Sequence, residues 1–586
     1  MDWVERSADE AVVTKLIEAG ETPLFARLLA LRGVTADTLR VFRSPKWGDI
    51  PEPDELPGIA DAARAVLDML KTGRKIVIFG DYDCDGLCAT AILTLVLRRL
   101  SAVLGVDSQI ATFIPERLTE GYGLSDASVA RMLESNPDVA MVVTVDNGVN
   151  AIAQIDALKT KGISVVVTDH HLPGEELPAA DVLVDPKVAA PPHLSELCGA
   201  MVAYFLARSL FRLVRDETGR DDVAGGMNGS LLVMGSLATV TDIMPLVGIN
   251  RTLVLNALRE FHARASLGLR ILYQNATRKV MSALTAKDFG CLLGPRINAV
   301  GRLGGGTQAL DLLLCSDEDR AEAQRLAEEI EKLNYDRRMV EQRMTVSAFE
   351  RRTEGDTAQV ISFSSGTDGE NVHSGVAGIV ASRLMERLRP SVPVCVLVDG
   401  KGSARAPQGY NIRDALAMCG EYLTAFGGHA AAAGLSVKPG CLDAFREAFC
   451  AACSEQARVM EEACAGAMQF DATVAVAEVT DEFAREVECL APFGEGNPDP
   501  VFMLRGLWID LAGLRRRGID GQHLQITFRA KSLPRTIWRN HGDIEERIRM
   551  RGEAAYDILF TIRMVEADYG SDYPVMNIVA MREASE

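Results

Sequence analysis

Three carboxylates lie within five residues of one another, directly after a short apolar run. Residues 75–80 form a strand-length β-branched segment, and Asp81, Asp83 and Asp85 follow it at alternate positions before the apolar stretch 87–100. This order predicts strand, loop and helix, with the loop at the carboxyl end of the strand, where ligand sites collect in open parallel sheets. Alternating carboxylates can bind a hard divalent cation. Taken alone, the loop fits an acidic surface turn equally well.

The same pattern recurs after two later strand-like runs and one helical run. These runs end at residues 145, 168 and 240, and they are followed by Asp146, by Asp169, His170 and His171, and by Asp242. Residues at several strand ends of one sheet would face the same crevice. Carboxylate and imidazole ligands favour Mn²⁺ or Mg²⁺ over zinc. The set is large enough for two ions bridged by Asp146, and two ions about 4 Å apart support phosphoester hydrolysis.

The elements that must position these residues indicate several domains, as expected for 586 residues. Strand and helix runs alternate through residues 75–184, which predicts a doubly wound parallel sheet. A polar helix over 316–352 is long enough, at about 50 Å, to join two domains. A second α/β domain begins near residue 359, and alternating strands toward the C-terminus predict a small β-barrel.

Two arginines and several polar residues lie in glycine-rich segments. Residues 294–304 contain Arg296 and Arg302, which suggests an anion clamp or a tight turn between domains, with a plain surface loop as the alternative. Ser403, Arg405 and His429 lie among later glycines. Such loops can hold a phosphate through backbone N–H groups and cationic side chains, although each one singly is more often a structural turn.

Charge and cysteine usage exclude some classes of function. A net charge of −19 argues against a general nucleic-acid coat, so contact with a polyanion must be confined to a groove or to metal ions. Residues 505–551 nevertheless carry 11 Lys and Arg against 5 Asp and Glu. Trp508, Phe528 and Trp538 in this region are candidates for stacking on bases, or core residues. The scattered cysteines suit reduced thiols, and no apolar run approaches the ~20 residues of a membrane span, which predicts a cytoplasmic protein.

On these motifs the chain resembles the DHH phosphoesterases, whose name-giving motif stands here as Asp169, His170 and His171. The likeness extends over nearly the whole chain. It is carried by residues 80–86, 114–117, 121–124, 294–304 and 490–498. Within the family, this ordered set is similar to the members that digest single-stranded DNA from its 5′ end. The resemblance therefore implies an exonuclease that releases 5′-mononucleotides and acts in DNA repair and recombination.

The resemblance also implies roles for individual residues. His171 would be catalytic beside the scissile phosphate, with Asp146 in the same reaction and Asp81 as an outer carboxylate. The implied metal ligands are Asp83, Asp85, Asp146, His170 and Asp242. The groups implied to hold DNA phosphates are Arg296, Arg302, Ser403, Arg405 and His429.

The implied architecture is an α/β chain of five parts. These are an N-terminal helical segment (1–50), a DHH domain with a parallel sheet (51–315), a connecting helix (316–352), a smaller α/β DHHA1 domain (353–465) and an OB-fold barrel (466–586). The implied cofactors are two divalent cations, Mn²⁺ or Mg²⁺. The implied partners are single-stranded DNA, a helicase and a single-strand-binding protein, with no membrane.

Three positions depart from the family's pattern. Phe79 stands where some members carry a ligand histidine, Val372 stands where a tryptophan is expected, and residues 566–577 lack the usual tryptophan and glutamine. Two other functions remain open, namely a phosphodiesterase for short oligonucleotides or signalling dinucleotides, and a catalytically silent DNA-binding scaffold. The residues themselves do not select the native ion, the direction of digestion or the oligomeric state.

Overall fold

The computed structural model describes residues 2–117, 119–277, 284–304, 306–368, 372–388, 390–463, 468–518, 521–565 and 572–584. The chain forms two compact units. One unit contains Ile50–Met244 and Leu253–Cys464, and the other contains Met1–Asp49, Pro245–Thr252 and Ala465–Glu586.

A five-stranded sheet forms the centre of the first half of the larger unit. Its strands pair in the order β3-β2-β4-β5-β6, and every pair is parallel. The strands are β2 (Lys75–Phe79), β3 (Ile110–Phe113), β4 (Val139–Val145), β5 (Ser164–Thr168) and β6 (Val182–Val184). All seven residues of β4 are buried, as expected for a parallel strand covered on both faces. The predicted parallel sheet is confirmed.

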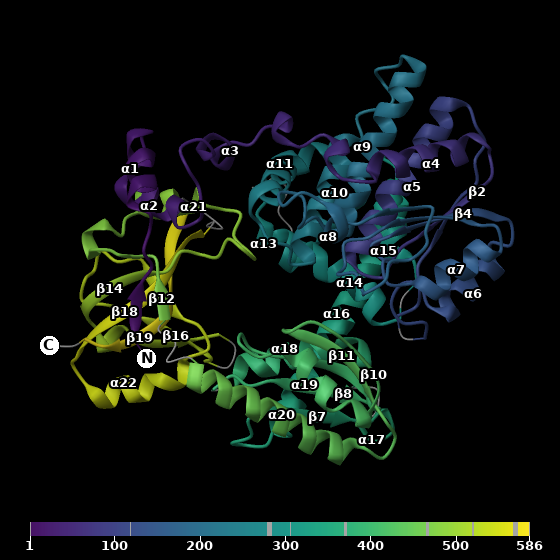
Figure 1. Ribbon diagram of the computed structural model, residues 1–586. Coiled ribbons are helices and arrows are strands. Elements are labelled where there is room, and N and C mark those ends of the chain that lie inside the picture. The colour runs from purple at the N-terminus through teal and green to yellow at the C-terminus, as the bar shows by residue number, and fades with distance from the viewer. Residues whose placement is uncertain are drawn as a thin grey trace. The chain divides into compact units, whose positions relative to one another are not determined.

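Helices cover both faces of this sheet. Figure 1 shows α6 (Asp126–Ser135) and α7 (Ile152–Thr160) on one side, with α4 (Ile59–Lys71) and α5 (Cys84–Leu104) on the other. On the first side, Ile155 and Leu158 of α7 share a buried cluster with Val77 and Phe79 of β2. Apolar residues that recur about every 3.6 residues on the helices thus pack against apolar residues that alternate along the strands.

Helix α5 begins and ends at well-defined signals. The carboxylate of Asp83 caps its N-terminus, and Gly105 follows its last residue with φ 67°. By length and composition this helix is apolar enough to cross a membrane, which the sequence expectation of no such run overlooked. However, 67% of its most apolar 18-residue window is buried inside the protein, as in the core helix of an α/β sheet.

Further helices complete this half of the unit. They are α8 (Pro186–Ala189), α9 (Gly199–Thr218), α10 (Asn228–Thr241), α11 (Gly248–Arg264), α12 (Leu267–Thr277), α13 (Ala286–Asp288), α14 (Gly294–Arg302), α15 (Gln308–Leu314) and α16 (Arg320–Glu350). The residues of α11 up to Thr252 belong to the smaller unit. Helix α16 is the predicted long connecting helix.

The expectation of a loop over 294–304 was wrong, because most of that segment is helix α14. Its glycines permit close packing rather than a turn. A Cβ atom on Gly301 would lie 2.6 Å from the carbonyl oxygen of Tyr82, in the loop between β2 and α5. Glycine in the interior of a helix is unfavourable by itself, so this close approach explains the residue.

The second half of the larger unit is a mixed five-stranded sheet in the order β10-β11-β9-β8-β7. Only β7 and β8 pair in parallel. The strands are β7 (Gln359–Phe363), β8 (Val394–Val398), β9 (Lys401–Arg405), β10 (Leu423–Gly428) and β11 (Ala432–Val437). The helices are α17 (Ser365–Asp368), α18 (Ala377–Arg387), α19 (Ile412–Met418) and α20 (Leu442–Ala463). Cys450 and Cys453 lie within α20.

The smaller unit combines the two ends of the chain. Its N-terminal elements are β1 (Trp3–Glu5), α1 (Glu10–Glu18), α2 (Pro23–Ala30) and α3 (Leu39–Arg43). Its C-terminal elements are β12 (Met468–Phe470), β13 (Ala472–Thr473), α21 (Asp481–Glu488), β14 (Phe502–Trp508), β15 (Arg515–Arg517), β16 (His523–Ile526), β17 (Arg535–Trp538), α22 (Glu545–Arg551), β18 (Ala555–Val565) and β19 (Tyr573–Glu583). Leu16 and Phe25 from the N-terminal helices share one core with Phe502 and Phe560 of the strands.

The C-terminal strands form one sheet in the order β13-β14-β18-β19-β17-β16-β15. Strands β13 and β15 are its edges, and no pairing between them occurs within the described ranges. Strand β1 pairs in parallel with β12, so the start of the chain extends this unit by a strand.

Candidate active site

Acidic residues follow four neighbouring strands of the parallel sheet. Asp81, Asp146, Asp169 and Asp185 come directly or almost directly after β2, β4, β5 and β6, which are adjacent in the sheet. Two further carboxylates come from helix ends, because Asp85 lies in the first turn of α5 and Asp242 follows the last residue of α10. The carboxyl ends of parallel strands therefore gather the predicted residues at one edge of the sheet.

His170 lies at the centre of this group. Its Nε2 atom is 3.0 Å from Asp146 Oδ1, 3.4 Å from Asp85 Oδ2 and 3.7 Å from Asp242 Oδ2. Burial lowers the pKa of His170, which favours the neutral imidazole that ligates metals. Three carboxylates facing one imidazole nitrogen are a suitable set of ligands for a divalent cation.

Backbone N–H groups fix two of the carboxylates. Asp83 Oδ1 accepts hydrogen bonds from the N–H groups of Asp85 (3.0 Å) and Gly86 (3.1 Å). Asp85 accepts from the N–H groups of Gly199 (2.8 Å) and Ala200 (2.7 Å). These donors belong to the N-termini of α5 and α9, where the helix dipole favours negative charge. Both side chains are therefore held in place before any cation binds.

Asp146 has an unusual backbone. Its φ is 64°, a left-handed conformation that L-residues other than Asn and Asp rarely adopt. Gly199 lies so close that a Cβ atom there would be 2.6 Å from Asp146 Cβ. The phenolic O–H of Tyr122 donates to the Asp146 carbonyl oxygen at 2.8 Å. The turn after β4 is thus constrained on two sides.

Several buried oxygens lack a hydrogen-bond partner. Within the part of the chain that the structure describes, neither oxygen of Asp81 has one, nor does Asp146 Oδ1. Burial and the neighbouring carboxylates raise the pKa of Asp81 and of Asp146 well above the usual range. The same causes raise the pKa of Asp242 to about 8. Unpaired buried oxygens are costly, and a divalent cation is the partner that satisfies them.

The ligand atoms fall into three groups of metal-binding size. In each group the nitrogen or oxygen atoms lie within 4.8 Å of one another. The groups are Asp81, Asp83 and Asp146; Asp85, His170 and Asp242; and Asp146, His170 and His171. Asp146 and His170 each belong to two of them, and the two oxygens of the Asp146 carboxylate make it the better candidate for a bridging ligand.

His171 is paired with the first residue of its own motif. Its Nδ1 atom lies 2.7 Å from Asp169 Oδ1. Burial alone would lower the pKa of His171, but the Asp169 carboxylate outweighs it and raises the pKa to about 9. Asp169 is itself fixed, because its Oδ2 accepts from the N–H of Val149 at 2.9 Å. Asp169 therefore favours the protonated form of His171 beside the acidic cluster.

A second group of side chains in the same unit is cationic. Burial and the nearby Arg117 lower the pKa of Arg302 to about 10, and Asp83 acts in the opposite direction. Burial and Arg117 also lower the pKa of Arg405 and of His373. Arg302 therefore lies within electrostatic reach of both the carboxylates and the other arginines.

Arg405 and Ser403 lie against the N-terminus of α18. A Cβ atom on Gly378, in the first turn of that helix, would be 2.6 Å from Arg405 Nη2 and 3.3 Å from Ser403 Oγ. An arginine, a hydroxyl and a helix N-terminus together are a suitable site for a phosphate group. The structure thus brings Arg302, Ser403 and Arg405 together.

Arg296 and His429 occupy different surroundings. The Arg296 guanidinium bonds the carboxylate of Glu331 in α16 and donates to the carbonyl oxygen of Leu292 at 2.8 Å. His429 is exposed between β10 and β11, and its N–H donates to the carbonyl oxygen of Ala432 at 2.8 Å. Neither side chain has a recorded contact with the carboxylate cluster.

Four contributors were missed as site residues by sequence reasoning. Tyr122, Asp169, Arg117 and Asp185 all lie next to proposed ligands or phosphate-binding groups. Asp185 is buried with a raised pKa of about 7, caused by burial and by Asp169. Its position after β6 repeats the strand-end pattern and was a usable signal. The glycines on both sides of Tyr122, with φ values of 87° and 56°, were another.

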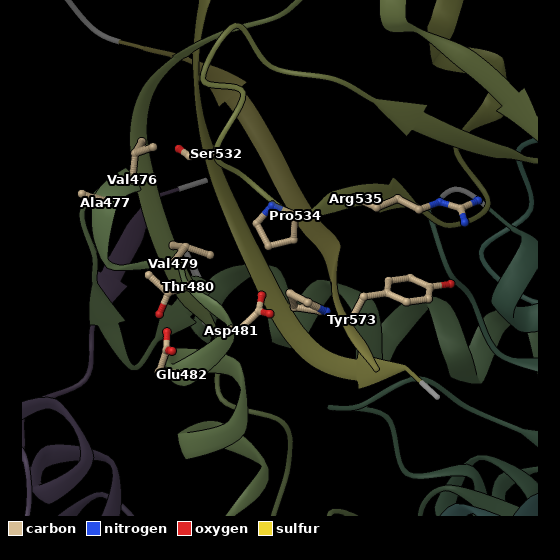
Figure 2. A pocket seen from close by; sticks show the side chains of 11 residues that line it. Val476, Ala477, Val479, Thr480, Asp481, Glu482, Ser532, Pro534, Arg535 and Tyr573 are labelled. Atoms are coloured by element: carbon tan, nitrogen blue, oxygen red, sulfur yellow. The ribbon is translucent and has the colours of Figure 1, made fainter. Parts of the chain in front are cut away.

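The smaller unit offers exposed groups of another kind. Phe528 and Trp538 are core residues, whereas Trp508 is exposed with the Arg529 guanidinium 5.5 Å from its ring centroid. A pocket of about 530 Å³ lies beside the start of α21. Figure 2 shows Arg535 and Tyr573 extending to the same side of it. Its lining contains no histidine, so the carboxylate and histidine cluster is the better candidate for hydrolytic chemistry.

Comparison with known families agrees with this arrangement. The family described as "DHH family, N-terminal domain" matches residues 75–227, the DHHA1 domain matches residues 356–455, and the RecJ OB domain matches residues 470–569. These regions lie inside the predicted domains 51–315, 353–465 and 466–586. The outer boundaries of those domains stay a prediction.

Two curated relatives are described as single-stranded-DNA-specific exonuclease RecJ. The protein from Salmonella typhimurium is 34% identical over 538 residues, which is 89% of this chain and 88% of the relative. The protein from Bacillus subtilis is 32% identical over 558 residues, which is 94% of this chain and 67% of the relative.

Solved structures extend the likeness to the whole fold. RecJ from Thermus thermophilus in complex with Mn²⁺ matches with a TM-score of 0.80 and 28% identity, covering 100% of this chain and 80% of that one. Its complex with Mg²⁺ matches with a TM-score of 0.72 and 26% identity, covering 100% and 79%. From its domains, its relatives and the geometry of its carboxylate cluster, we conclude that the chain belongs to the RecJ family of DHH exonucleases.

Proposed function

We propose that this protein is a metal-dependent exonuclease that hydrolyses phosphodiester bonds of single-stranded DNA. The observation that carries the proposal is the convergence of Asp85, Asp146 and Asp242 on His170, beside buried carboxylate oxygens that lack hydrogen-bond partners. The relatives described as single-stranded-DNA-specific exonucleases support the same reaction.

Divalent cations are the cofactors, as in the Mn²⁺ and Mg²⁺ complexes of the Thermus relative. Asp83, Asp85, Asp146, His170 and Asp242 would hold two of them, and Asp146 would bridge. Bound cations supply an activated water and stabilise the charge that develops on phosphate oxygens.

The chain's own groups orient the substrate and hold protons. His171, protonated on Nδ1 toward Asp169, places a positive charge next to the proposed position of the scissile phosphate. The Tyr122 hydroxyl lies 3.1 Å from His171 Nδ1 and also holds the Asp146 carbonyl, so it links the imidazole to the bridging carboxylate. Asp81 lies with Asp83 and Asp146 in one of the three ligand groups and would support the bridging carboxylate from there.

Phosphates of the strand would be held by Arg302, Ser403 and Arg405, with Arg117 as an added contact. These groups lie at the N-terminus of α18 and within electrostatic reach of Asp83. A contact to phosphate carries no base information, so digestion is expected to be independent of sequence. We place the entering 5′ phosphate here, which gives digestion from the 5′ end.

The C-terminal sheet would supply a further contact to the strand. Exposed Trp508 and the all-exposed strand β15, with Arg515, Arg516 and Arg517, combine stacking and positive charge. A helicase that supplies single strands and a single-strand-binding protein would be its partners in repair and recombination. We place the protein in the cytoplasm, where bacterial DNA is processed.

Two alternatives are disfavoured. A phosphodiesterase for very short oligonucleotides or dinucleotides needs no basic C-terminal domain. A silent DNA-binding scaffold would have lost ligands, whereas here the whole set converges at one sheet edge.

The test is digestion of a long strand labelled at its 5′ or its 3′ end, with Mn²⁺, with Mg²⁺ or with chelator, against the same sequence as blunt duplex. The expected result is metal-dependent release of labelled mononucleotide from the 5′ end of the single strand only. Absence of cleavage with every cation would favour the scaffold. Faster cleavage of a three-nucleotide fragment than of the long strand would favour the short-substrate phosphodiesterase.

A further inference from the structure

Helix α10 ends in a turn that normally requires glycine. After the C-terminal residue Thr241 and the capping Asp242, the N–H of Ile243 donates to the carbonyl of Val240 at 3.3 Å, and the N–H of Met244 donates to Thr239 at 3.0 Å. This pair of hydrogen bonds is the Schellman motif, whose residue after the cap adopts a left-handed conformation. Ile243 occupies that position with φ 57°.

Isoleucine is the wrong residue for this turn by local criteria. A left-handed conformation brings the Cβ atom close to the following carbonyl oxygen, and a second branch at Cβ increases the crowding. Among the described residues, the other non-glycine positions with positive φ are Asp146, Asp399 and Asn540, all of types that tolerate it. Ile243 also gains nothing from burial, because it is 70% exposed.

The position of Ile243 relative to the carboxylate cluster suggests a role for this strained residue. It directly follows Asp242, whose Oδ2 is 3.7 Å from His170 Nε2. The Asp242 side chain is 34% exposed, whereas those of Asp85, Asp146 and His170 are 1%, 3% and 7% exposed. Asp242 and His171, whose side chain is also 34% exposed, therefore mark the side on which the cluster opens to solvent. Consecutive Cα atoms are about 3.8 Å apart, so the backbone of Ile243 lies next to this exposed ligand.

We propose that Ile243 is a substrate-positioning residue whose side chain packs against a nucleobase next to the scissile phosphate. This inference rests on the proposed function. A rigid, branched aliphatic group in a fixed turn offers an apolar face at little further cost in conformational entropy. Every nucleobase has an apolar face, so the contact is independent of sequence. In a duplex, stacking of neighbouring base pairs covers that face, so the contact favours single strands.

The test combines three substitutions at this position with removal of the base. Ile243→Gly and Ile243→Asn relieve the backbone and delete the apolar contact, whereas Ile243→Val keeps the branched apolar surface. Substrates are a single-stranded oligonucleotide with a 5′ phosphate and two versions with an abasic site at the first or the second nucleotide. KM and kcat are measured for each pair.

For Ile243→Gly and Ile243→Asn we expect KM on the intact strand to rise about tenfold, because the lost contact corresponds to two or three buried methylene groups at partial coverage. On one of the two abasic strands, the KM of the wild type should rise to the value that Ile243→Gly shows on the intact strand. The KM of Ile243→Gly should be the same on that abasic strand as on the intact one. Such non-additivity identifies the base as the partner of the side chain. Ile243→Val should follow the wild type. The matched control is Val346→Ala, which truncates an exposed aliphatic side chain of α16.

Thermal unfolding separates this role from a structural one. Relief of the left-handed strain, partly offset by the greater chain entropy of glycine, should leave the Tm of Ile243→Gly equal to that of the wild type or about 1 °C higher. A lower Tm would show that the side chain is packed in the folded protein and would overturn the inference. Equal penalties on intact and both abasic strands would also overturn it while leaving the exonuclease assignment intact. If the wild type does not digest single-stranded DNA at all, the proposed function itself is wrong. This result differs from equal penalties on all three strands, which contradict only the role of Ile243.

Discussion

At the scale of single residues, the backbone conformation of Asp146 determines which substitution can test its proposed role as the bridging carboxylate. Its φ of 64° is tolerated by Asn but strained in Ala. Asp146→Asn should therefore keep the turn after β4 while removing the charge. We expect kcat to fall about 1,000-fold, since metal-held charge supplies several kcal/mol of transition-state stabilisation and each 1.36 kcal/mol is a factor of ten.

The measurement is single-strand digestion with Mn²⁺, beside the circular dichroism spectrum and the Tm. Asp399→Asn is the matched control, because Asp399 also has a positive φ, of 48°, but lies in the turn between β8 and β9. Wild-type cleavage by Asp146→Asn would contradict the bridging role.

Tyr122 is expected to act through its neighbours rather than on substrate. Its hydroxyl holds the carbonyl of Asp146 and lies next to His171. Tyr122→Phe should lower kcat about 10- to 100-fold, the usual effect of losing an outer partner of a metal site, and should change KM little. Tyr335→Phe removes the hydroxyl of an exposed tyrosine on α16 and serves as the control. A rise in KM with unchanged kcat would instead indicate direct contact with DNA.

At the scale of elements, the close approach of α9 to the turn after β4 holds the site together. A Cβ atom on Gly199 would lie 2.6 Å from Asp146 Cβ, and Gly199 also donates its N–H to Asp85. Gly199→Ala should therefore displace Asp146 and reduce activity, with a loss of about 1 to 3 kcal/mol in the free energy of unfolding. In contrast, a Cβ atom on Gly420 would meet nothing within 4 Å. Gly420→Ala should leave both quantities close to wild type, and equal effects of the two substitutions would refute the packing argument.

Arg296 and Arg405 differ in the secondary-structure elements that their side chains connect. Arg296 connects α14 to Glu331 of α16, whereas Arg405 points from β9 to the start of α18. Arg296→Ala should cost about 2 kcal/mol of stability, because hydrogen bonds to charged groups contribute about 1.5–3 kcal/mol. Arg405→Ala should mainly raise the KM for single-stranded DNA. Urea unfolding and strand-binding measurements on both variants test this division, and it fails if Arg296→Ala weakens binding more than Arg405→Ala does.

At the scale of the whole molecule, the carboxylate cluster should make the stability of the metal-free protein depend on pH. The pKa of Asp242 is raised to about 8, and that of His171 to about 9. Between the ordinary pKa of a carboxyl group and pH 8, the folded protein binds more protons at Asp242 than the unfolded chain does. The same holds at His171 between pH 6.5 and pH 9. Stability is therefore greatest at the acidic end of these windows and falls as pH rises through them.

We expect the Tm of the chelator-treated protein to be higher at pH 6 than at pH 8. Added Mn²⁺ should raise the Tm more at pH 8 than at pH 6, because cations compete with protons for the same oxygens. Scanning calorimetry at the two pH values, with and without Mn²⁺, measures both effects. A Tm of the metal-free protein that rises from pH 6 to pH 8 would contradict the predicted proton uptake by the folded cluster.

Much of this protein is determined locally by its sequence. The apolar runs that become β2, β4 and β5 can form little except buried parallel strands, and Asp81, Asp146 and the Asp169 to His171 motif follow them directly. Because parallel strands share one carboxyl edge, the sequence order alone predicts that these residues meet. The cap at Asp83 and the long helix α16 are likewise local, since capping and helical periodicity act over a few residues.

Tertiary structure decided what depends on close approach between distant segments. The glycines of 294–304 resembled a loop because glycine weakens helices, but Gly301 is needed where α14 packs on the Tyr82 carbonyl. Arg296 resembles a phosphate ligand in the sequence, and only the folded structure shows that it also bonds Glu331, 35 residues away. The contacts of Tyr122, the left-handed turn at Ile243 and the packing of the N-terminal helices on the C-terminal sheet arise in the same way. Residue types and spacing encode which groups can do chemistry, whereas only packing in three dimensions fixes their partners.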